Sequence, residues 1–234
     1  MIKLAADLHI HSCLSPCGDM EMTPNNLVNM AYLKGLDAIA VCDHNSTRNL
    51  PACKMIADAR ELVFIAGMEV ETKEEVHVLT LFADVKTAME FGGFVYAHLP
   101  DTPNIPGFFG EQIAMNDDDE PVYEEKKMLL QSTTLSIDDV VTACRQAGGL
   151  PIPAHINRTS NSLLNNLGFV PDNLRFPTLE VYKRLEIKGV DLEKYHVVYN
   201  SDAHNLTDMS ERENFISAYD RSPEGLLRYL AEYK

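Results

Sequence analysis

Short apolar runs alternate with segments of helical periodicity along most of the chain. The runs that we expect to form strands lie over residues 3–9, 38–42, 62–69, 76–82, 150–154, 178–181 and 197–200. The segments that we expect to form helices lie over residues 24–34, 55–61, 84–96 and 136–146, with a last helix beginning at 222–224. This alternation predicts an α/β fold with a largely parallel sheet, and seven strands are enough for a barrel.

Capping residues mark where some of these helices begin and end. Thr23 followed by Pro24 is typical of a helix start, and Gly35 is typical of the residue after a helix. Ser136 is a suitable N-cap for the helix that Gly148 follows. These signals support the predicted elements independently of the apolar pattern.

Residues 99–134 interrupt the alternation. Three prolines lie at the start of this segment and precede the acidic stretch 116–120. We expect that stretch to be the turn of a hairpin between residues 111–115 and 121–125. We therefore interpret the chain as a single domain over residues 1–234, with an insertion at 99–134 that packs over or beside a barrel.

The net charge of −15 over 234 residues argues against binding to extended nucleic acid or to an anionic membrane. A nucleotide substrate stays compatible with this charge, because bound divalent cations reverse the field locally. The chain shows no signal peptide, and none of its apolar stretches approaches the ~18–20 residues needed to span a bilayer. The five cysteines are odd in number and scattered, which favours reduced thiols and a cytoplasmic location.

Histidine and acidic residues recur where the expected strands end. The clusters are Asp7 to His11, Asp43-His44, Glu69 with His77, His155, and Asp202 to His204. Side chains alternate between the faces of a strand, so His9 and His11 point the same way. Strand ends converge at the carboxyl rim of a barrel, and imidazoles with carboxylates gathered there suit transition metals. The pattern predicts a multi-metal hydrolase.

Each cluster alone also has a structural explanation. A His-x-His pair can be a polar strand end, and Asp43-His44 can be an Asx turn that leaves a sheet. Glu69 is harder to explain, because a carboxylate on an apolar strand costs several kcal/mol if it is unpaired. Five such clusters in one chain favour a metal site over five separate structural roles. Asp7 is expected to support a ligand from behind.

These residues resemble the motifs of the polymerase-and-histidinol-phosphatase (PHP) family. The resemblance rests on Asp7-Leu8-His9-Ile10-His11, Asp43-His44, Gly67-Met68-Glu69, Ala154-His155 and Ser201-Asp202-Ala203-His204, in this order. It reaches to about residue 205, with the 99–134 insertion outside it. It implies a distorted seven-stranded TIM-like barrel, two or three divalent metal ions (Zn, Mn or Fe), and hydrolysis of phosphoesters.

The resemblance also implies how the ligands are divided among the metals. One metal would take His9, His11, Glu69 and Asp202; a second would take Glu69 as a bridge with His77 and His155; a third would take His44, His204 and a residue soon after the first motif. Among these residues, Glu69, Asp202 and His204 are expected to act most directly in catalysis.

The first loop departs from the family pattern. Many relatives have Ser-Asp-Gly about four residues after the second histidine, where this chain reads Ser15-Pro16-Cys17-Gly18-Asp19. We favour Asp19 as the ligand, because hard oxygen ligands suit a site that handles phosphate. Cys17 and Cys13 stay open as alternatives, since their spacing also suits a thiolate site.

Two arginines are candidates for substrate binding. Arg158 lies three residues after His155, and its planar guanidinium is expected to anchor a phosphate. Arg48, just past His44, is the second candidate, and the alternative for both is a solvated surface charge. Residues 182–184 follow an expected strand and are expected to line the mouth of the site.

We therefore expect a metal-dependent phosphoesterase that uses a metal-activated hydroxide. The expected substrate is a small phosphate ester, such as a nucleotide, a short oligonucleotide, or a sugar or amino-alcohol phosphate. Two alternatives stay open: an amidohydrolase-type barrel, which also carries His-x-His on its first strand, and a non-catalytic PHP module that keeps the metal site. The 99–134 insertion is expected to select substrates while leaving the metal chemistry intact.

Overall fold

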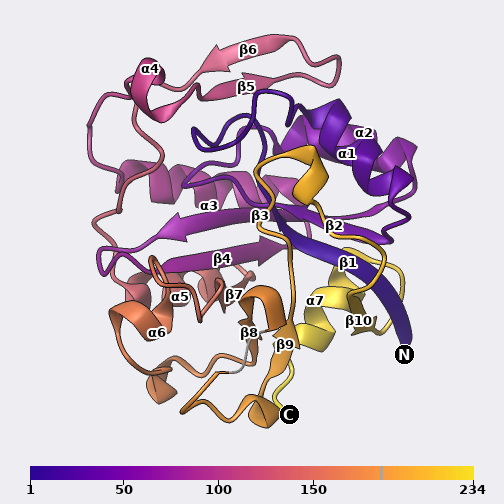
Figure 1. Ribbon diagram of the computed structural model, residues 1–234, viewed down its shortest axis with the longest axis vertical. Coiled ribbons are helices and arrows are strands. Elements are labelled where there is room, and N and C mark those ends of the chain that lie inside the picture. The colour runs from indigo at the N-terminus through magenta and orange to yellow at the C-terminus, as the bar shows by residue number, and fades with distance from the viewer. Residues whose placement is uncertain (185–186) are drawn as a thin grey trace.

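The computed structural model describes residues 1–184 and 187–234 and is built around one curled, six-stranded sheet (Figure 1). The strand order is β10-β1-β2-β3-β4-β7, and two further pairs, β5-β6 and β8-β9, stand apart from its ladders. The strands are β1 (Ile2–Ile10), β2 (Ala38–Val41), β3 (Val63–Glu71), β4 (His77–Phe82), β5 (Ile113–Met115), β6 (Pro121–Glu124), β7 (Leu150–Pro153), β8 (Thr178–Glu180), β9 (His196–Val198) and β10 (Phe215–Ala218). The α-helices are α1 (Pro24–Leu33), α2 (Leu50–Ala59), α3 (Val85–Ala97), α4 (Pro106–Phe109), α5 (Ile137–Gln146), α6 (Leu163–Asn166) and α7 (Pro223–Ala231).

The predicted α/β fold is confirmed, and the capping signals act as expected. The Thr23 side chain accepts a hydrogen bond from the backbone N–H of Asn26 at the start of α1, and Ser136 forms a capping box with Asp139 at the start of α5. The start of α2 was misplaced: the helix begins at Leu50, because a proline in its first turn is compatible with helical backbone. Strand β10 was not predicted.

The sheet is mixed, so the prediction of a largely parallel sheet is wrong. Strands β1, β2 and β3 run parallel, whereas β4 is antiparallel to both β3 and β7, and β10 is antiparallel to β1. Only a short turn joins β3 to β4, and such a connection permits antiparallel pairing alone. This reversal brings the first residue of β4, His77, to the same edge as the ends of β1, β2, β3 and β7.

Within the described residues, backbone ladders do not close the sheet into a seven-stranded barrel. Ala154, just after β7, donates its backbone N–H to His77 O on β4. Backbone groups alternate in direction along a strand, so those of residues 151 and 153 point away from β4, toward the side where β8 lies. Both are prolines and have no N–H, which prevents a ladder between β7 and β8. On the far side, β1 meets the β9 loop through a single bridge between Ile10 and Ala203. The sheet is a curled half-barrel bordered by the β8-β9 pair.

Two apolar clusters lie on the two faces of the sheet. The outer cluster joins strand side chains to α1, α2, α3 and α5, and the inner cluster joins them to α7. Leu8 packs in the inner cluster but Ile10 packs in the outer one, although residues two apart share a face in a regular strand. The register with β2 shifts between Asp7 and Ile10. This irregularity changes the direction in which the side chains at the end of β1 point, where His9 and His11 lie.

The 99–134 segment contains the predicted hairpin. Strands β5 and β6 pair antiparallel, and Figure 1 shows the pair at the top of the view, away from both termini. The segment is anchored to the loop after β1: Ile113 N donates to Cys13 O at 3.3 Å, and Asn49 bridges Ser12 Oγ and Met115 N at 2.9 and 2.8 Å. No helix in the described part of the chain is long and apolar enough to cross a membrane.

Candidate metal centre

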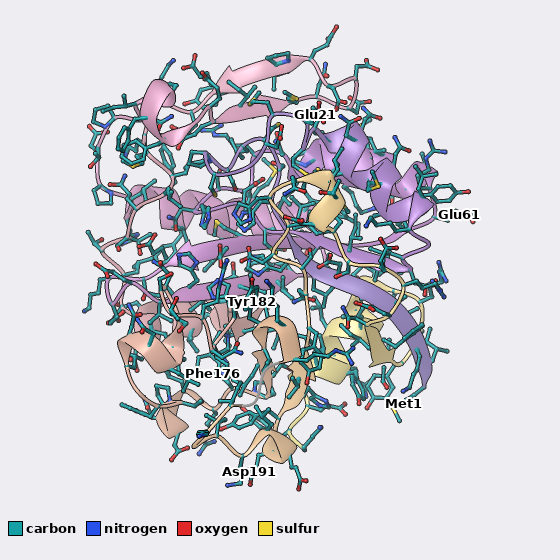
Figure 2. The ribbon with its side chains drawn as sticks, in the orientation of Figure 1. Met1, Glu21, Glu61, Phe176, Tyr182 and Asp191 are labelled. Carbon is teal, nitrogen blue, oxygen red and sulfur yellow. The ribbon has the colours of Figure 1, made fainter. Side chains whose placement is uncertain are left out.

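Eight of the predicted ligands meet at one edge of the curled sheet. His9 and His11 end β1, His44 follows β2, Glu69 lies near the end of β3, His77 begins β4, His155 follows β7, and Asp202 and His204 follow β9. Figure 2 shows nitrogen-bearing rings gathered around the middle of the sheet, with Tyr182 nearby. The structure therefore brings together residues that are up to 195 positions apart, from His9 to His204.

Glu69 lies at the centre of this cluster and is fully buried. Its carboxylate oxygens lie 2.9 Å from His77 Nδ1, 3.0 Å from His155 Nε2 and 3.1 Å from His44 Nδ1, and 3.4 Å from both His9 Nε2 and His11 Nε2. Burial alone raises the pKa of Glu69, but the surrounding histidines outweigh it and hold that pKa well below the ordinary value. Glu69 is thus an ionised, buried carboxylate in contact with five imidazoles.

Asp202 forms the second anionic point of the cluster. Its Oδ1 lies 3.2 Å from His11 Nε2 and 3.4 Å from His9 Nε2, and its other oxygen pairs with Arg158. Burial raises the pKa of Asp202, but His9 and His11 lower it far more, so the side chain is ionised. Asp202 and His155 have left-handed backbone, with φ of 52° and 28°. Such conformations are uncommon for residues other than glycine, and they cluster at functional sites.

Several buried polar atoms of the cluster lack a hydrogen-bond partner among the described residues. They are His44 Nδ1, Glu69 Oε2, His77 Nε2 and His155 Nδ1. His44 Nδ1 and Glu69 Oε2 lie only 3.1 Å apart, yet their geometry is not that of a hydrogen bond. Buried polar atoms without partners are costly, and a cation shared between them would satisfy them. These atoms fit a metal centre.

The donor atoms form three overlapping groups that could each hold an ion. Within each group the atoms lie within 4.8 Å of one another: His9, His11 and Asp202; His44, Glu69 and His77; His11, His44 and His204. Burial lowers the pKa of His44 well below its ordinary value and lowers that of His204 to about 4. Both imidazoles are therefore neutral near pH 7, as metal ligands must be. Mixed nitrogen and oxygen donors suit Zn, Mn and Fe.

The structure does not bring the Asp19 carboxylate into these groups. Asp19 is exposed, its Oδ1 accepts the backbone N–H of Glu21, and its own N–H donates to His204 O. Cys13 is buried, and its Sγ lies 3.6 Å from Ile113 O, toward the insertion. Cys17 is exposed. Partial removal of its thiol from water, together with the Glu69 carboxylate, raises the pKa of that thiol to about 12.

Residues that were not predicted as ligands hold the candidate ligands in place. Asp43, expected only as part of a motif, accepts hydrogen bonds from Ser12 N, Ser12 Oγ and Ser15 Oγ at 2.6–2.7 Å. Ser15 Oγ lies 3.0 Å from His11 Nδ1. Asp7 does not contact a candidate ligand directly; its carboxylate accepts the backbone N–H of Ser201, which precedes Asp202.

A buried carboxylate on β8 was missed entirely. Glu180 lies 3.1 Å from His9 Nδ1 and also accepts the backbone N–H of His155 at 2.7 Å. It is an isolated acidic residue in an apolar run, so only the tertiary structure reveals its role.

The two candidate arginines have different surroundings. Arg158 pairs with Asp202 and lies over the Tyr182 ring at 4.9 Å, at the edge of the cluster. Arg48 instead pairs with Glu125 of the insertion at 3.3 Å and lies over the Tyr123 ring at 4.1 Å. The structure therefore places Arg158, and not Arg48, beside the metal centre.

A cavity of about 690 Å³ opens beside the cluster. Its walls include Arg158, Tyr182, Lys183, Arg184, Asp202 and His204. This arrangement agrees with the prediction that residues 182–184 line the mouth of the site. Among the described residues, none from the 99–134 insertion lines this cavity. The structure therefore gives no support to the expected role of the insertion in substrate selection.

This arrangement defines an α/β protein with a buried cluster of potential metal ligands beside an open cavity. The model of the PHP domain matches residues 7–223, and the chain belongs to this family. Among curated proteins, the chain is 32% identical over 81 residues to a 5'-3' exoribonuclease of Haemophilus influenzae. That match covers 33% of this chain and 28% of the relative. An uncharacterized protein of Methanocaldococcus jannaschii is 29% identical over 119 residues, which are 43% of this chain and 70% of that protein.

Solved structures share the fold at low sequence identity. The lesion-specific endonuclease Q of Pyrococcus furiosus is 19% identical, with a TM-score of 0.70, over 98% of this chain and 56% of that chain. A putative metal-dependent phosphoesterase of Bifidobacterium adolescentis is also 19% identical, with a TM-score of 0.62, over 97% of this chain and 96% of that one. The chain thus spans about half of endonuclease Q and less than a third of the exoribonuclease.

These neighbours correct the expectation about partners. A structure of endonuclease Q in complex with a 27-mer duplex substrate carrying an abasic lesion has a TM-score of 0.67 to this chain. The fold therefore accommodates extended nucleic acid, and the exclusion that we drew from the net charge is wrong. Net charge is an average over the whole surface and does not describe the cavity, where Arg158, Lys183 and Arg184 lie among acidic residues such as Asp202 and Asp208.

Proposed function

We propose that the chain is a metal-dependent phosphoesterase that hydrolyses a phosphate ester of a nucleotide or a nucleic-acid strand. The observation that carries this proposal is the buried cluster of histidines around Glu69, in which four polar atoms lack a partner among the described residues. The cluster lies beside a cavity whose lining includes Arg158, Lys183 and Arg184. Membership of the PHP family and the names of the exoribonuclease and endonuclease relatives support the reaction and the class of substrate.

We propose that two or three divalent ions bind to His9, His11, His44, Glu69, His77, His155, Asp202 and His204. When bound, such ions lower the pKa of a water molecule and neutralise charge on the phosphoryl oxygens. Glu69 contributes by holding five imidazoles in one place, and Asp202 and His204 bring the cluster to the cavity wall. Asp19 would join this set of ligands only if the first loop rearranges. Cys17 would join it only if its thiol loses its proton.

Arg158 is proposed to bind the phosphoryl group. Its side chain is 38% exposed and pairs with Asp202, so the guanidinium reaches both the cluster and the cavity. A planar guanidinium offers paired N–H donors to phosphate oxygens. Lys183 and Arg184, on the same wall, are suited to the neighbouring phosphates of a longer substrate.

The test is hydrolysis by the full chain after removal of metal and reconstitution with Mn²⁺, Zn²⁺ or Fe²⁺. The substrates should include an aryl phosphate, nucleoside monophosphates, 5'-phosphorylated oligonucleotides, and duplex DNA with and without an abasic site. A carboxylic amide and a lactone added to the panel address the amidohydrolase alternative. We expect metal-dependent release of phosphate or nucleotide, and a metal-loaded protein that leaves every phosphoester intact would instead indicate a non-catalytic module.

A further inference from the structure

Glu180, the last residue of β8, is a buried carboxylate that the proposed reaction does not use. It is 2% exposed and contacts residues from three other segments of the fold. One oxygen lies 3.1 Å from His9 Nδ1 and 2.7 Å from the backbone N of His155, and the other lies 2.8 Å from Asn200 Nδ2. Glu180 therefore links β1, β7 and β9 behind the metal centre.

These contacts determine which nitrogen of His9 carries the proton. An ionised carboxylate has acceptors only, and the His155 and Asn200 N–H groups already donate to its two oxygens. His9 Nδ1 must therefore be a donor to Glu180. The remaining nitrogen, His9 Nε2, faces Glu69 and Asp202, each 3.4 Å away, and is the nitrogen available to a metal cation.

We propose that Glu180 is a positioning residue of the metal centre, which fixes His9 with its Nε2 toward the metal and holds the His155 segment beside it. The inference rests on the proposed function, because it requires that His9 is a metal ligand. A carboxylate behind a ligating imidazole sets the orientation of the ring and raises its basicity.

The hydrogen-bond partners of Glu180 show why a glutamine cannot replace it. In Glu180→Gln, one oxygen becomes an NH₂ donor, while three N–H groups still point at the side chain. Rotating the new amide toward Asn200 does not help, because Asn200 Oδ1 already accepts the backbone N–H of Leu8 at 2.9 Å. Whichever way the new amide turns, a donor faces a donor.

The experiment is a competition titration of the metal-free full chain with Zn²⁺ against a chromophoric chelator. We expect Glu180→Gln to weaken Zn²⁺ binding about 10–100-fold, the usual effect of changing a group that orients a ligand. Glu125→Gln is the matched control, because Glu125 is also buried, at 1% exposure, but it bonds to Arg48 and Tyr96 away from the cluster. The affinity of the Glu125→Gln variant for Zn²⁺ should stay within a factor of about two of the wild-type affinity.

A double-mutant cycle separates positioning from general loss of structure. Because Glu180 acts through His9 as well as through the His155 segment, the effect of Glu180→Gln on the remaining Zn²⁺ sites should be clearly smaller in a His9→Ala background. An equal effect in both backgrounds would overturn the proposal. Wild-type affinity in the Glu180→Gln variant would also overturn it while leaving the proposed function intact, whereas a wild-type chain that binds no Zn²⁺ would overturn both.

The wild-type protein provides a test even if the Glu180→Gln variant does not fold. In the Zn²⁺-loaded chain, ¹⁵N NMR of the imidazoles distinguishes the ligating nitrogen from the protonated one, with His9 assigned by its loss in His9→Asn. We expect His9 to carry its proton on Nδ1 and to ligate through Nε2. Ligation through Nδ1 would overturn the role of Glu180.

Discussion

His9 and His11 point their Nε2 atoms at each other across 3.1 Å at the end of β1. The Nδ1 of His9 faces Glu180, and the Nδ1 of His11 faces Ser15, whose hydroxyl donates to Asp43. Both Nδ1 atoms are therefore donors, which leaves both Nε2 atoms as lone-pair acceptors. Two acceptors at this distance require a proton or a metal cation between them.

Binding of Zn²⁺ should therefore release protons and weaken as the pH falls. Burial lowers the pKa of His9, but the carboxylates of Glu180, Glu69 and Asp202 outweigh it and hold that pKa well above the ordinary value. The metal-free pair thus carries a proton at neutral pH, and the cation must displace it. Calorimetric titrations in two buffers of different ionisation enthalpy measure the protons released. Binding enthalpies that are independent of the buffer would contradict the prediction.

The metal-free protein should become less stable as the pH rises through about 9. Burial lowers the pKa of His77, but Glu69 and Glu71 outweigh it and raise that pKa from 6.5 to about 9. A group whose pKa is raised by folding stabilises the fold fully below its unfolded value, here 6.5, and loses this contribution as the pH rises through its folded value. We expect a loss on the order of 1–3 kcal/mol between pH 7 and 10, measured by urea unfolding with chelator present.

His77→Asn is the control for this pH dependence, because it removes the titrating imidazole and keeps a polar side chain. Its free energy of unfolding should fall less steeply over the same pH range. Equal slopes for the variant and the wild type would assign the alkaline loss to other groups.

Glu69→Gln should impair catalysis more than Arg158→Ala. Glu69 contacts five imidazoles, so its neutralisation should lower both the metal content and kcat, by at least about 100-fold for kcat. The Arg158 side chain pairs with Asp202, so its removal should affect mainly KM, with metal content preserved. Elemental analysis and steady-state kinetics on one phosphoester measure both effects. If Arg158→Ala abolished turnover while Glu69→Gln kept a near-normal kcat, the two roles would have to be exchanged.

The sequence predicted most members of this cluster because they lie at strand ends and in short motifs. His9-x-His11 and Asp202-x-His204 are visible without a fold, and Glu69 is conspicuous as a carboxylate on an apolar strand. Glu180 was not predicted, since an isolated acidic residue gains meaning only when β8 lies against β1 and β7. The direction of β4 and the gap between β7 and β8 depend on turn length and on prolines, which the apolar pattern does not represent.

The 99–134 insertion was expected to be separable from the metal centre, but its contacts indicate otherwise. The Asn49 side chain bonds both to Ser12 and to the backbone of Met115. Ser12 in turn bonds to Asp43. We expect Asn49→Ala to lower the free energy of unfolding by about 1–3 kcal/mol, because it leaves buried partners unsatisfied. Urea unfolding of the two proteins measures this difference, and a change below about 0.5 kcal/mol would show that the bridge contributes little.

Two glycines in the same insertion allow a sharper test of its packing on the first loop. Gly110 has a φ of 107°, and a Cβ placed on it would lie 1.9 Å from Pro16 O, whereas a Cβ on Gly107 would meet nothing within 4 Å. Pro16 follows His11 in the first loop, so a displaced insertion would disturb the ligands there. Gly110→Ala should cost about 2 kcal/mol or more of stability and weaken Zn²⁺ binding, while Gly107→Ala should change stability by less than about 0.5 kcal/mol. Urea unfolding and Zn²⁺ titration of both variants measure these effects, and equal behaviour of the two would mean that the insertion does not support the metal centre.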